Sequence, residues 1–347
     1  MDRIKIVADR AVPFLEGVFE PYADVRYLDG SAIGPDDVRE ADALIIRTRT
    51  RCDAALLEGS RVRLIATATI GTDHIDMDWC DRAGILVRNA PGCNAGGVMQ
   101  YVFSALYGAA ARKSIPLKGK TMGIVGVGNV GRRVESMARY LGFRVLKCDP
   151  PREKAEGRFE FCSLEHLLRG SDIVTLHVPL DETTRGMADK RFFKIMKRHA
   201  IFINASRGEV VVDTALKAAI RKLGAVIIDT WNHEPDIDRD LLDRVDIGTP
   251  HIAGYSYQGK QNGTAAVVRA VAHYFGFQPL YEFFPQTDLP ENEAVKLDLR
   301  GMSQGEIAAV FQYNYPVFTD DFMFRLDPGR FEDLRSSYHY RREVFVD

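Results

Sequence analysis

Short hydrophobic runs alternate with longer polar stretches over the first 95 residues of the chain. The runs are rich in valine, isoleucine and leucine, and turn-forming residues bound them, a pattern that predicts buried strands. The predicted strands are Ile4–Ala8, Val25–Leu28, Ala43–Ile46, Leu64–Ala68 and Ile85–Arg88. Because polar helical stretches separate the runs, we predict a small α/β domain with a parallel sheet.

A second and longer series of hydrophobic runs begins after residue 118. Its predicted strands are Met122–Val125, Val145–Cys148, Asp172–His177, Ile201–Asn204, Ala225–Asp229 and Val245–Ile247. Apolar residues at helical spacing predict helices at Val98–Arg112, Val130–Leu141 and Gly263–Phe275, with Asn94 as a cap of the first helix. Strands and helices that alternate over this length are typical of a Rossmann-type, doubly wound parallel sheet.

A glycine-rich segment lies between the strand Met122–Val125 and its helix. Gly126, Gly128 and Gly131 form the pattern GxGxxG. In this context the first glycine permits a tight turn, the second lets the backbone approach a pyrophosphate, and the third lets the helix pack on the sheet. A glycine-rich turn without a ligand is the alternative, but strand, helix and a downstream acid together favour a nucleotide site. The predicted site comprises Gly126, Gly128, Asn129, Val130, Gly131 and Asp149.

Asp149 is that acid, and it ends the next predicted strand. A carboxylate at this place accepts hydrogen bonds from the adenosine ribose and repels the 2′-phosphate of NADP. The basic residues Lys147 and Arg152 lie close by in the sequence, so some use of NADP remains an alternative. We predict NAD as the cofactor.

Charge and cysteine usage narrow the classes of partner. The chain has 46 basic and 48 acidic residues and a net charge of −2, which argues against general binding to nucleic acid or anionic membranes. The partner is therefore expected to be a small molecule. Five widely spaced cysteines, charged residues at the start and the lack of a long uncharged run predict a cytoplasmic protein with free thiols.

Polar residues follow three strands of the second series, in the segments Asn204–Gly208, Asp229–Pro235 and Thr249–Tyr255. Ligands of α/β sheets bind at the carboxyl ends of strands. Hydride transfer from a carbon that bears a hydroxyl needs a base, a cation for a neighbouring carboxylate, and a group that orients the base.

We predict that His251 is the base, Glu234 orients it, and Arg207 binds the carboxylate and polarises the C2 oxygen. Taken singly, these residues have structural interpretations as a core histidine, a loop carboxylate and a surface ion pair. Their order behind a nucleotide fold favours catalysis.

With these residues the chain resembles the D-2-hydroxyacid dehydrogenase family, in which an arginine, a glutamate and a histidine follow the dinucleotide fold in this order. The resemblance extends from the first strand to about Glu343, and its strongest segments are 66–76, 90–95, 123–133, 148–151 and 246–255. It implies NAD contacts at Asp149, Ala205, Ser206, Arg207, Asp229 and Gly254, and substrate contacts at Thr48, Thr69 and Tyr255.

Three domains are predicted. Residues 1–95 and 256–277 form a flavodoxin-like α/β substrate domain, and 96–255 form the Rossmann domain that binds NAD. From residue 278 to 347 the composition shifts to aromatic and acidic residues, which predicts a small α+β region for dimerisation of two identical chains.

The most similar branch of the family oxidises a phosphorylated four-carbon hydroxyacid, so a second cation should meet the phosphate. Arg47 ends the strand Ala43–Ile46 with the hydroxyl of Thr48 beside it, and we predict that it binds the phosphate. Arg341 or Arg342 is a further candidate. The alternatives are an enzyme for phosphoglycerate, glyoxylate or hydroxypyruvate, and an NAD-sensing protein that resembles corepressors of this fold.

A metal site is not predicted. His74 lies between Asp73 and Asp76, but this spacing matches no common zinc or hard-cation motif. A structural turn is the favoured interpretation.

Overall fold

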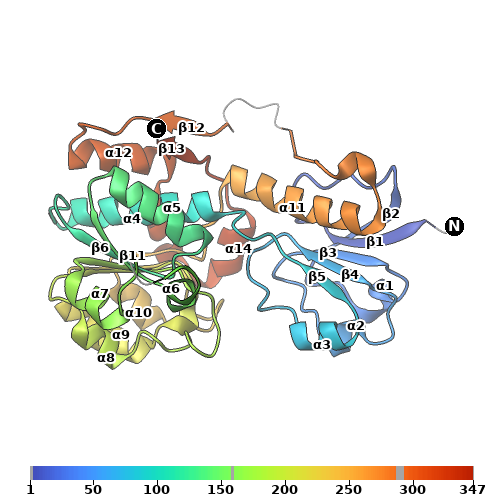
Figure 1. The fold of residues 1–347 in the computed structure, drawn as a ribbon, viewed down its shortest axis with the longest axis horizontal. Helices are drawn as coiled ribbons and strands as arrows, with labels where there is room; N and C mark the ends of the chain where they lie inside the picture. Colours follow the sequence, from blue (N-terminus) through green and yellow to red (C-terminus); the bar gives the residue numbers. More distant parts are fainter. Residues whose placement is uncertain (1–2, 158–159, 287–292, 347) are drawn as a thin grey trace. The chain divides into compact units, whose positions relative to one another are not determined.

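The computed structural model describes residues 3–157, 160–286 and 293–346. The chain divides into two compact units (Figure 1). The first unit comprises Met1–Asn94 and Tyr257–Glu293, and the second comprises Ala95–Ser256 and Ala294–Asp347. The separate C-terminal domain from residue 278 remains a prediction, and the ends of the predicted outer domains, residues 1 and 347, lie outside the described residues.

The first unit contains a five-stranded parallel sheet with the order β2-β1-β3-β4-β5. This is the strand order of flavodoxin-like folds. The strands are β1 (Ile4–Asp9), β2 (Ala23–Leu28), β3 (Ala43–Ile46), β4 (Leu64–Thr67) and β5 (Leu86–Arg88). All five strands predicted for this region are present. β3 has the predicted ends, and each of the other four differs from its prediction by one or two residues at one end.

Helices cover both faces of this sheet, because the strands are apolar on both faces. In β3, Ala43 and Ile45 pack into one core while Leu44 and Ile46 pack into the other, and all four side chains are fully buried. Figure 1 shows α11 on one side and α2 and α3 on the other. The helices of this unit are α1 (Pro35–Val38), α2 (Ala54–Leu57), α3 (Met77–Arg82), α11 (Tyr257–Phe275) and the 3-10 turn η4 (Gln278–Leu280).

Helix α11 starts at Tyr257, earlier than the predicted start at Gly263. Its first turns contain two buried glycines, Gly259 and Gly263, which weaken the helical signal in the sequence. A Cβ atom at Gly263 would lie 3.1 Å from the carbonyl oxygen of Ala68. Glycine therefore permits the close approach of α11 to the chain just after β4.

The second unit contains a six-stranded sheet with the order β11-β10-β9-β8-β6-β7, in which all pairs are parallel. The strands are β6 (Thr121–Val125), β7 (Arg144–Cys148), β8 (Ile173–Leu176), β9 (Ile201–Asn204), β10 (Ala225–Ile228) and β11 (Ile247–Gly248). The chain runs from β6 outward to β7 and then returns to β8 on the other side of β6. The predicted doubly wound sheet is thus confirmed, and its ligand crevice is expected at this reversal.

Two helical layers cover the second sheet. Figure 1 shows α4, α5 and α12 on one side of it and α7 to α10 on the other. Helix α4 (Ala95–Arg112) precedes the first strand of this sheet. The helices that come after its strands are α5 (Asn129–Tyr140), α6 (Pro150–Glu156), α7 (Leu164–Gly170), α8 (Lys190–Ile195), α9 (Asp213–Ala219), α10 (Arg239–Arg244) and the 3-10 turns η2 (Gly208–Val210) and η3 (Ile220–Lys222).

Helix α4 begins at Ala95, but Asn94 does not cap it as predicted. The Asn94 Oδ1 atom is buried and has no hydrogen-bond partner among the described residues. The carboxylate of Glu343 takes this role instead, because it accepts hydrogen bonds from the Gly97 backbone and from the Ser256 hydroxyl at 2.7 Å. A negative charge at this end of a helix is favourable.

The C-terminal part of the second unit packs on both faces of its sheet. Phe311 of α12 joins the core beside α4, whereas Phe324 of α13 and Phe331 of α14 join the core on the opposite face. The elements are β12 (Val295–Leu297), α12 (Gln304–Asn314), α13 (Val317–Leu326), the 3-10 turn η6 (Pro328–Arg330), α14 (Phe331–Ser336) and β13 (Val344–Val346). Strands β12 and β13 form a separate parallel pair.

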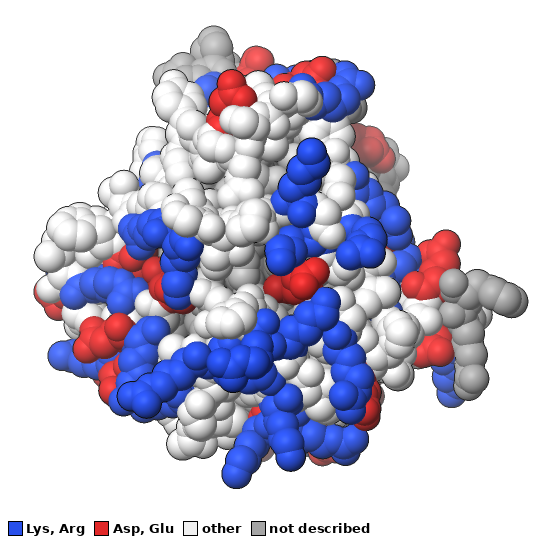
Figure 2. Space-filling view, turned by 90° about the vertical axis from the view of Figure 1, so that its left-hand side faces the viewer, with Lys and Arg blue, Asp and Glu red and all other residues white. Residues whose placement is uncertain are grey.

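Lysine and arginine side chains form a broad band on the face shown in Figure 2, with carboxylates set among them. Because the whole chain has a net charge of −2, any excess of positive charge on this face is balanced by acidic residues elsewhere in the chain. In the second unit, exposed ion pairs such as Arg139–Glu135 at 3.0 Å and Arg169–Glu165 at 2.8 Å neutralise part of the charge. Every helix among the described residues is too short or too polar to pass through a bilayer.

Candidate active site

The glycine loop between β6 and α5 has the geometry of a phosphate-binding turn. Gly126 has φ of +83°, and a Cβ atom there would lie 2.5 Å from the carbonyl oxygen of His177. A Cβ atom at Gly131 would overlap the carbonyl oxygen of Gly126, whereas one at Gly128 would meet nothing within 4 Å. The fold itself thus requires Gly126 and Gly131, while Gly128 leaves space beside the start of α5 for a bound anion.

Asp149 holds this loop from the end of β7. Its Oδ2 accepts a hydrogen bond from the Val127 N–H at 2.7 Å, and its Oδ1 accepts one from the Arg152 N–H at 3.1 Å. The Arg152 guanidinium donates to the Val127 carbonyl at 2.8 Å and to Glu156 at 2.7 Å. Arg152, which the sequence offered as a possible contact for the 2′-phosphate of NADP, is therefore engaged with the loop and with Glu156.

The three predicted catalytic residues follow neighbouring strands. Arg207 comes after β9, Glu234 after β10 and His251 after β11, and these strands lie side by side. A Cβ atom at Gly208 would overlap the backbone of Trp231, so the turn after Arg207 lies directly against the loop that carries Glu234. The Arg207 Nη1 donates to the Ser206 carbonyl at 2.8 Å.

Glu234 and His251 form a direct pair. His251 Nδ1 lies 2.7 Å from Glu234 Oε2, and the other Glu234 oxygen accepts the Trp231 N–H at 2.9 Å. Because a carboxylate only accepts hydrogen bonds, Nδ1 carries the proton, which leaves Nε2 able to accept one. The peptide bond between Glu234 and Pro235 is cis.

The environment keeps the Glu234 carboxylate ionised. Burial alone would raise the pKa of Glu234, but His251 and the hydrogen bond from Trp231 outweigh this effect, so the pKa is lowered. A charged carboxylate at this place orients the imidazole and is suited to stabilising an imidazolium.

Asp229 anchors the segment around His251. Its Oδ1 accepts the Thr249 hydroxyl at 2.7 Å and the Ile252 N–H at 2.8 Å, and its Oδ2 accepts the Ala253 N–H at 3.0 Å. The Asp229 carbonyl accepts the His251 N–H at 2.8 Å. His251 itself has φ of +55°, a conformation that these bonds stabilise. The structure thus gives Asp229 a supporting role, while its predicted contact with NAD stays a prediction.

Sequence reasoning missed several residues that support this site. Tyr101 of α4 bonds the Thr249 hydroxyl at 2.7 Å, and Trp231 donates from its indole to the Thr249 carbonyl at 2.8 Å. Tyr315 donates to the Ile252 carbonyl at 2.6 Å. These residues lie far from the motifs in the chain, so spacing could not reveal them.

Of the other predicted contacts in this unit, Ser206 is buried and donates its hydroxyl to Asn204 at 2.8 Å. Ala205 and Val130 pack against the core beside α4 and α5. Asn129, the first residue of α5, is exposed, and Gly254 is partly exposed. Tyr255 packs edge-on against Tyr338 with ring centroids 5.8 Å apart.

In the first unit, the predicted substrate residues gather at one edge of the sheet. Arg47 and Thr48 follow β3, and Thr69 follows the neighbouring strand β4. Arg47 is partly buried as a residue, and its guanidinium donates an exposed hydrogen bond to the Ala11 carbonyl at 2.9 Å, while Thr48 is exposed. The Thr69 hydroxyl bonds Thr67 at 2.7 Å.

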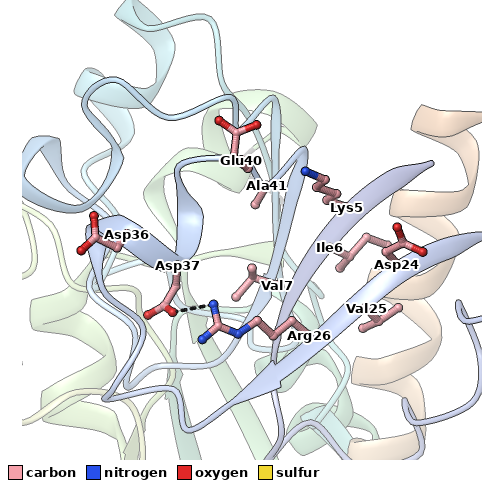
Figure 3. Close-up of a pocket in the computed structure, with 10 residues that line it drawn as sticks. All are labelled: Lys5, Ile6, Val7, Asp24, Val25, Arg26, Asp36, Asp37, Glu40 and Ala41. Carbon is pink, nitrogen blue, oxygen red and sulfur yellow. Dashed lines mark ion pairs between the residues drawn. The ribbon is translucent and has the colours of Figure 1, made fainter. Parts of the chain in front are cut away.

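A hollow of about 290 Å³ lies elsewhere in this unit and contains none of the predicted site residues (Figure 3). Its charged lining is mainly acidic, with Asp24, Asp36, Asp37 and Glu40 against Lys5 and Arg26. Arg26 is paired with Asp37 at 2.8 Å. This hollow is therefore poorly suited to an anionic hydroxyacid.

The segment around His74 is built as a turn. Asp76 caps α3 by accepting the Trp79 N–H at 2.9 Å, and His74 Nε2 lies 3.3 Å from the Thr67 hydroxyl. Among residues 3–157, 160–286 and 293–346, no group of three or more histidine, cysteine or acidic side chains is placed to hold a metal ion.

The fold and these residues define the class of protein. Residues 100–253 match the family described as D-isomer specific 2-hydroxyacid dehydrogenase, NAD binding domain. The D-lactate dehydrogenase of Aquifex aeolicus, solved with NAD and lactic acid, superposes with a TM-score of 0.67 at 25% identity, over 81% of this chain and 98% of that one.

Full-length relatives give a narrower assignment. The chain is 44% identical to the erythronate-4-phosphate dehydrogenase of Bacteroides fragilis, over 98% of this chain and 97% of that protein. It is 41% identical to the enzyme of the same name from Porphyromonas gingivalis, over 98% of this chain and 94% of that protein. The chain therefore belongs to the erythronate-4-phosphate dehydrogenase family, within the NAD-dependent D-2-hydroxyacid dehydrogenases.

Proposed function

We propose that the protein oxidises 4-phospho-D-erythronate at C2 to (R)-3-hydroxy-2-oxo-4-phosphobutanoate, in the biosynthesis of pyridoxal 5′-phosphate (vitamin B6). The observation that carries the chemistry is the hydrogen bond of 2.7 Å between His251 and Glu234, because it leaves one imidazole nitrogen as a base. The names of the relatives supply the substrate.

His251 accepts the proton of the C2 hydroxyl at Nε2 while Glu234 stabilises the charge that develops on the imidazole. Arg207 binds the substrate carboxylate with its planar guanidinium and polarises the C2 oxygen. NAD bound at the glycine loop would supply the acceptor for the hydride of C2. The reverse reaction returns the proton from His251.

NAD fits the glycine loop, because Gly128 leaves open space beside the N-terminus of α5. We assign the pyrophosphate to the loop of Gly126, Gly128, Asn129, Val130 and Gly131, and the ribose to Asp149. Ala205, Ser206, Arg207 and Gly254 are assigned to the remainder of the cofactor, with Asp229 supporting the segment that ends in Gly254.

Substrate contacts are assigned to Arg47, Thr48, Thr69 and Tyr255. Arg47 supplies a positive charge and Thr48 a hydroxyl donor, which together suit the oxygens of a phosphate. Thr69 lies at the same edge of the sheet as Arg47, since β3 and β4 are paired.

A substrate panel tests this function. We expect kcat/KM for 4-phospho-D-erythronate to exceed that for 3-phosphoglycerate, glyoxylate, hydroxypyruvate and unphosphorylated erythronate by roughly tenfold or more, as one charge-assisted contact provides. NADH formation or consumption is the measurement. A higher value for phosphoglycerate or hydroxypyruvate would reassign the substrate, and binding of NADH without turnover of any member would indicate a sensing protein.

We further propose that two copies of the chain form a dimer through α12 and α13, in the cytoplasm. Four large apolar side chains are exposed there: Tyr313 (81%), Phe322 (59%), Met323 (42%) and Leu326 (63%). Large exposed apolar side chains on two consecutive helices favour association. The cysteines are odd in number, widely spaced and free, which supports a reducing compartment.

The dimer has its own test. We expect the double substitution Phe322→Glu and Leu326→Glu to change the sedimentation coefficient from that of a dimer to that of a monomer, because it places charges in an apolar contact. Tyr274→Glu, at an exposed aromatic residue of the first unit, is the matched control and should remain dimeric. A wild-type protein that sediments as a monomer contradicts the proposal.

A further inference from the structure

Two basic side chains lie beside Asp149, the residue assigned to the adenosine ribose. Lys147 is on β7, and Arg152 is in the first turn of α6, the helix that Asp149 caps. The 2′-phosphate of NADP takes the place of a ribose hydroxyl that this carboxylate would bind, and an arginine nearby can accommodate that phosphate. The state of these two cations therefore bears on the choice between NAD and NADP.

The charge of Lys147 is already neutralised. Its side chain is only 6% exposed, and its Nζ lies 2.7 Å from a carboxylate oxygen of Glu160 and 3.1 Å from one of Glu135. A buried ammonium held by two carboxylates is poorly placed to meet a further anion. Arg152 is therefore the cation of this pair that could serve NADP.

Arg152 is fixed close to the Asp149 carboxylate because both bind Val127 of the glycine loop. Asp149 Oδ2 accepts the Val127 N–H at 2.7 Å, and Arg152 Nη1 donates to the Val127 carbonyl at 2.8 Å. The Arg152 N–H also donates to Asp149 Oδ1 at 3.1 Å. The guanidinium carbon lies 5.2 Å from the centroid of the Phe161 ring. The Arg152 side chain is thus held at the edge of the site assigned to the ribose.

Glu156, one helical turn after Arg152, binds the guanidinium with both of its carboxylate oxygens. Arg152 Nε donates to Oε1 at 2.7 Å, and Nη2 donates to Oε2 at 2.5 Å. A guanidinium binds a phosphate with the same planar fork that it uses for a carboxylate. Glu156 therefore fills the fork, and the Val127 carbonyl takes the remaining nitrogen.

The pair is well aligned, but solvent limits its strength. The Arg152 side chain is 20% exposed and that of Glu156 is 46% exposed. Ion pairs with this degree of exposure contribute little to folding. Glu156 is also the last residue of α6, and alanine has a high helix propensity. Replacing Glu156 by alanine is therefore expected to release the guanidinium without unfolding the helix.

We propose that Glu156 is a specificity-determining residue for the cofactor. By binding the fork of Arg152, it withholds that cation from a 2′-phosphate, and so it adds to the preference for NAD that Asp149 sets by repulsion. Arg152 is thus a latent contact for NADP that the native chain keeps closed. This inference rests on the proposed assignment of the ribose to Asp149.

Nucleotide affinity tests this proposal without any turnover. NADH and NADPH are titrated into the full-length protein, freed of bound nucleotide, and Kd is measured from the nicotinamide fluorescence. In Glu156→Ala we expect the ratio of Kd for NADPH to Kd for NADH to fall by roughly three- to tenfold, less than a buried charge-assisted contact provides, because the pair is exposed. An unchanged ratio overturns the proposal.

Glu165→Ala is the matched control. Glu165 of α7 accepts hydrogen bonds from Nε and Nη2 of Arg169 at 3.1 and 2.8 Å, also one helical turn away, and its side chain is 47% exposed. Its loss removes the same kind of pair and the same charge, but from a helix that carries none of the residues assigned to the cofactor. The ratio should stay at the wild-type value. An equal fall in Glu165→Ala would trace the effect to net charge and overturn the proposal.

A double substitution separates the role of Arg152 from the charge of Glu156 itself. Glu156 also lies 3.5 Å from Arg132 of α5, so its loss affects two cations. When Arg152→Met is added to Glu156→Ala, the gain for NADPH should vanish, and the ratio should equal that of Arg152→Met alone. A gain that persists overturns the proposal, because it would assign the effect to Arg132 or to the negative charge of Glu156.

The ribose assignment has its own variant, Asp149→Ser, in which serine can still cap α6. The ratio should fall here too, because repulsion of the 2′-phosphate is removed. An unchanged ratio in Asp149→Ser overturns the ribose assignment and the inference with it, whereas a fall there with an unchanged ratio in Glu156→Ala overturns the inference alone. Both measurements need only nucleotide binding, so they are independent of whether 4-phospho-D-erythronate is the substrate.

Discussion

His251→Asn is expected to lower kcat by about 100- to 10,000-fold, the range that proton transfer by a positioned base contributes. Asparagine is the appropriate replacement because His251 has φ of +55°, and asparagine adopts this left-handed conformation more readily than most residues. The segment anchored by Asp229 should therefore keep its shape. Initial rates with the phosphorylated hydroxyacid and NAD affinity by fluorescence titration are the measurements.

His233→Asn is the matched control for that substitution. His233 also has a left-handed backbone, with φ of +60°, and precedes Glu234 directly, but its side chain is exposed. We expect wild-type turnover in this variant and nearly unchanged NAD affinity in both. Wild-type kcat in His251→Asn would show that another group is the base.

Arg47→Ala is expected to lower kcat/KM for the phosphorylated substrate by about ten- to a hundredfold, which corresponds to a charge-assisted contact of roughly 1.5–3 kcal/mol. Its effect on the dephosphorylated analogue should be much smaller, because that analogue lacks the group that Arg47 binds. Steady-state kinetics with both substrates measure the difference.

Arg51→Ala provides the comparison, since Arg51 lies in the same segment but is 84% exposed and paired with Asp53 at 2.9 Å. It should affect neither substrate. Arg47 also donates to the Ala11 carbonyl, so its loss has a structural component as well. If Arg47→Ala impairs both substrates equally, that component explains the effect and the phosphate is bound elsewhere.

The strands and the glycine loop were predictable from sequence because their signals are local. The predicted boundaries of Ala43–Ile46 and Ile201–Asn204 match the structure, since both are apolar runs that end at a polar residue. Arg207, Glu234 and His251 were predicted to lie near one another because each follows a strand, and parallel strands bring their carboxyl ends to one edge of the sheet. The structure places them after three neighbouring strands and brings His251 and Glu234 into contact.

What the sequence could not supply are contacts between distant segments. The capping of α4 by Glu343 replaces the predicted role of Asn94, and no local rule joins residues so far apart. The same holds for the contact of Tyr101 with Thr249. The aromatic C-terminal stretch suggested packing or dimerisation, but not that its helices would lie against the Glu234 loop.

The discontinuity of the first unit has a consequence for synthesis on the ribosome. One face of its sheet is covered by Val267, Val268, Val271 and Ala272 of α11, which are translated long after β5 ends at Arg88. At about 5–20 residues per second, this face waits on the order of ten to forty seconds for its helix. Until then the nascent chain exposes apolar strand residues on that face, and such exposure favours aggregation of incomplete chains.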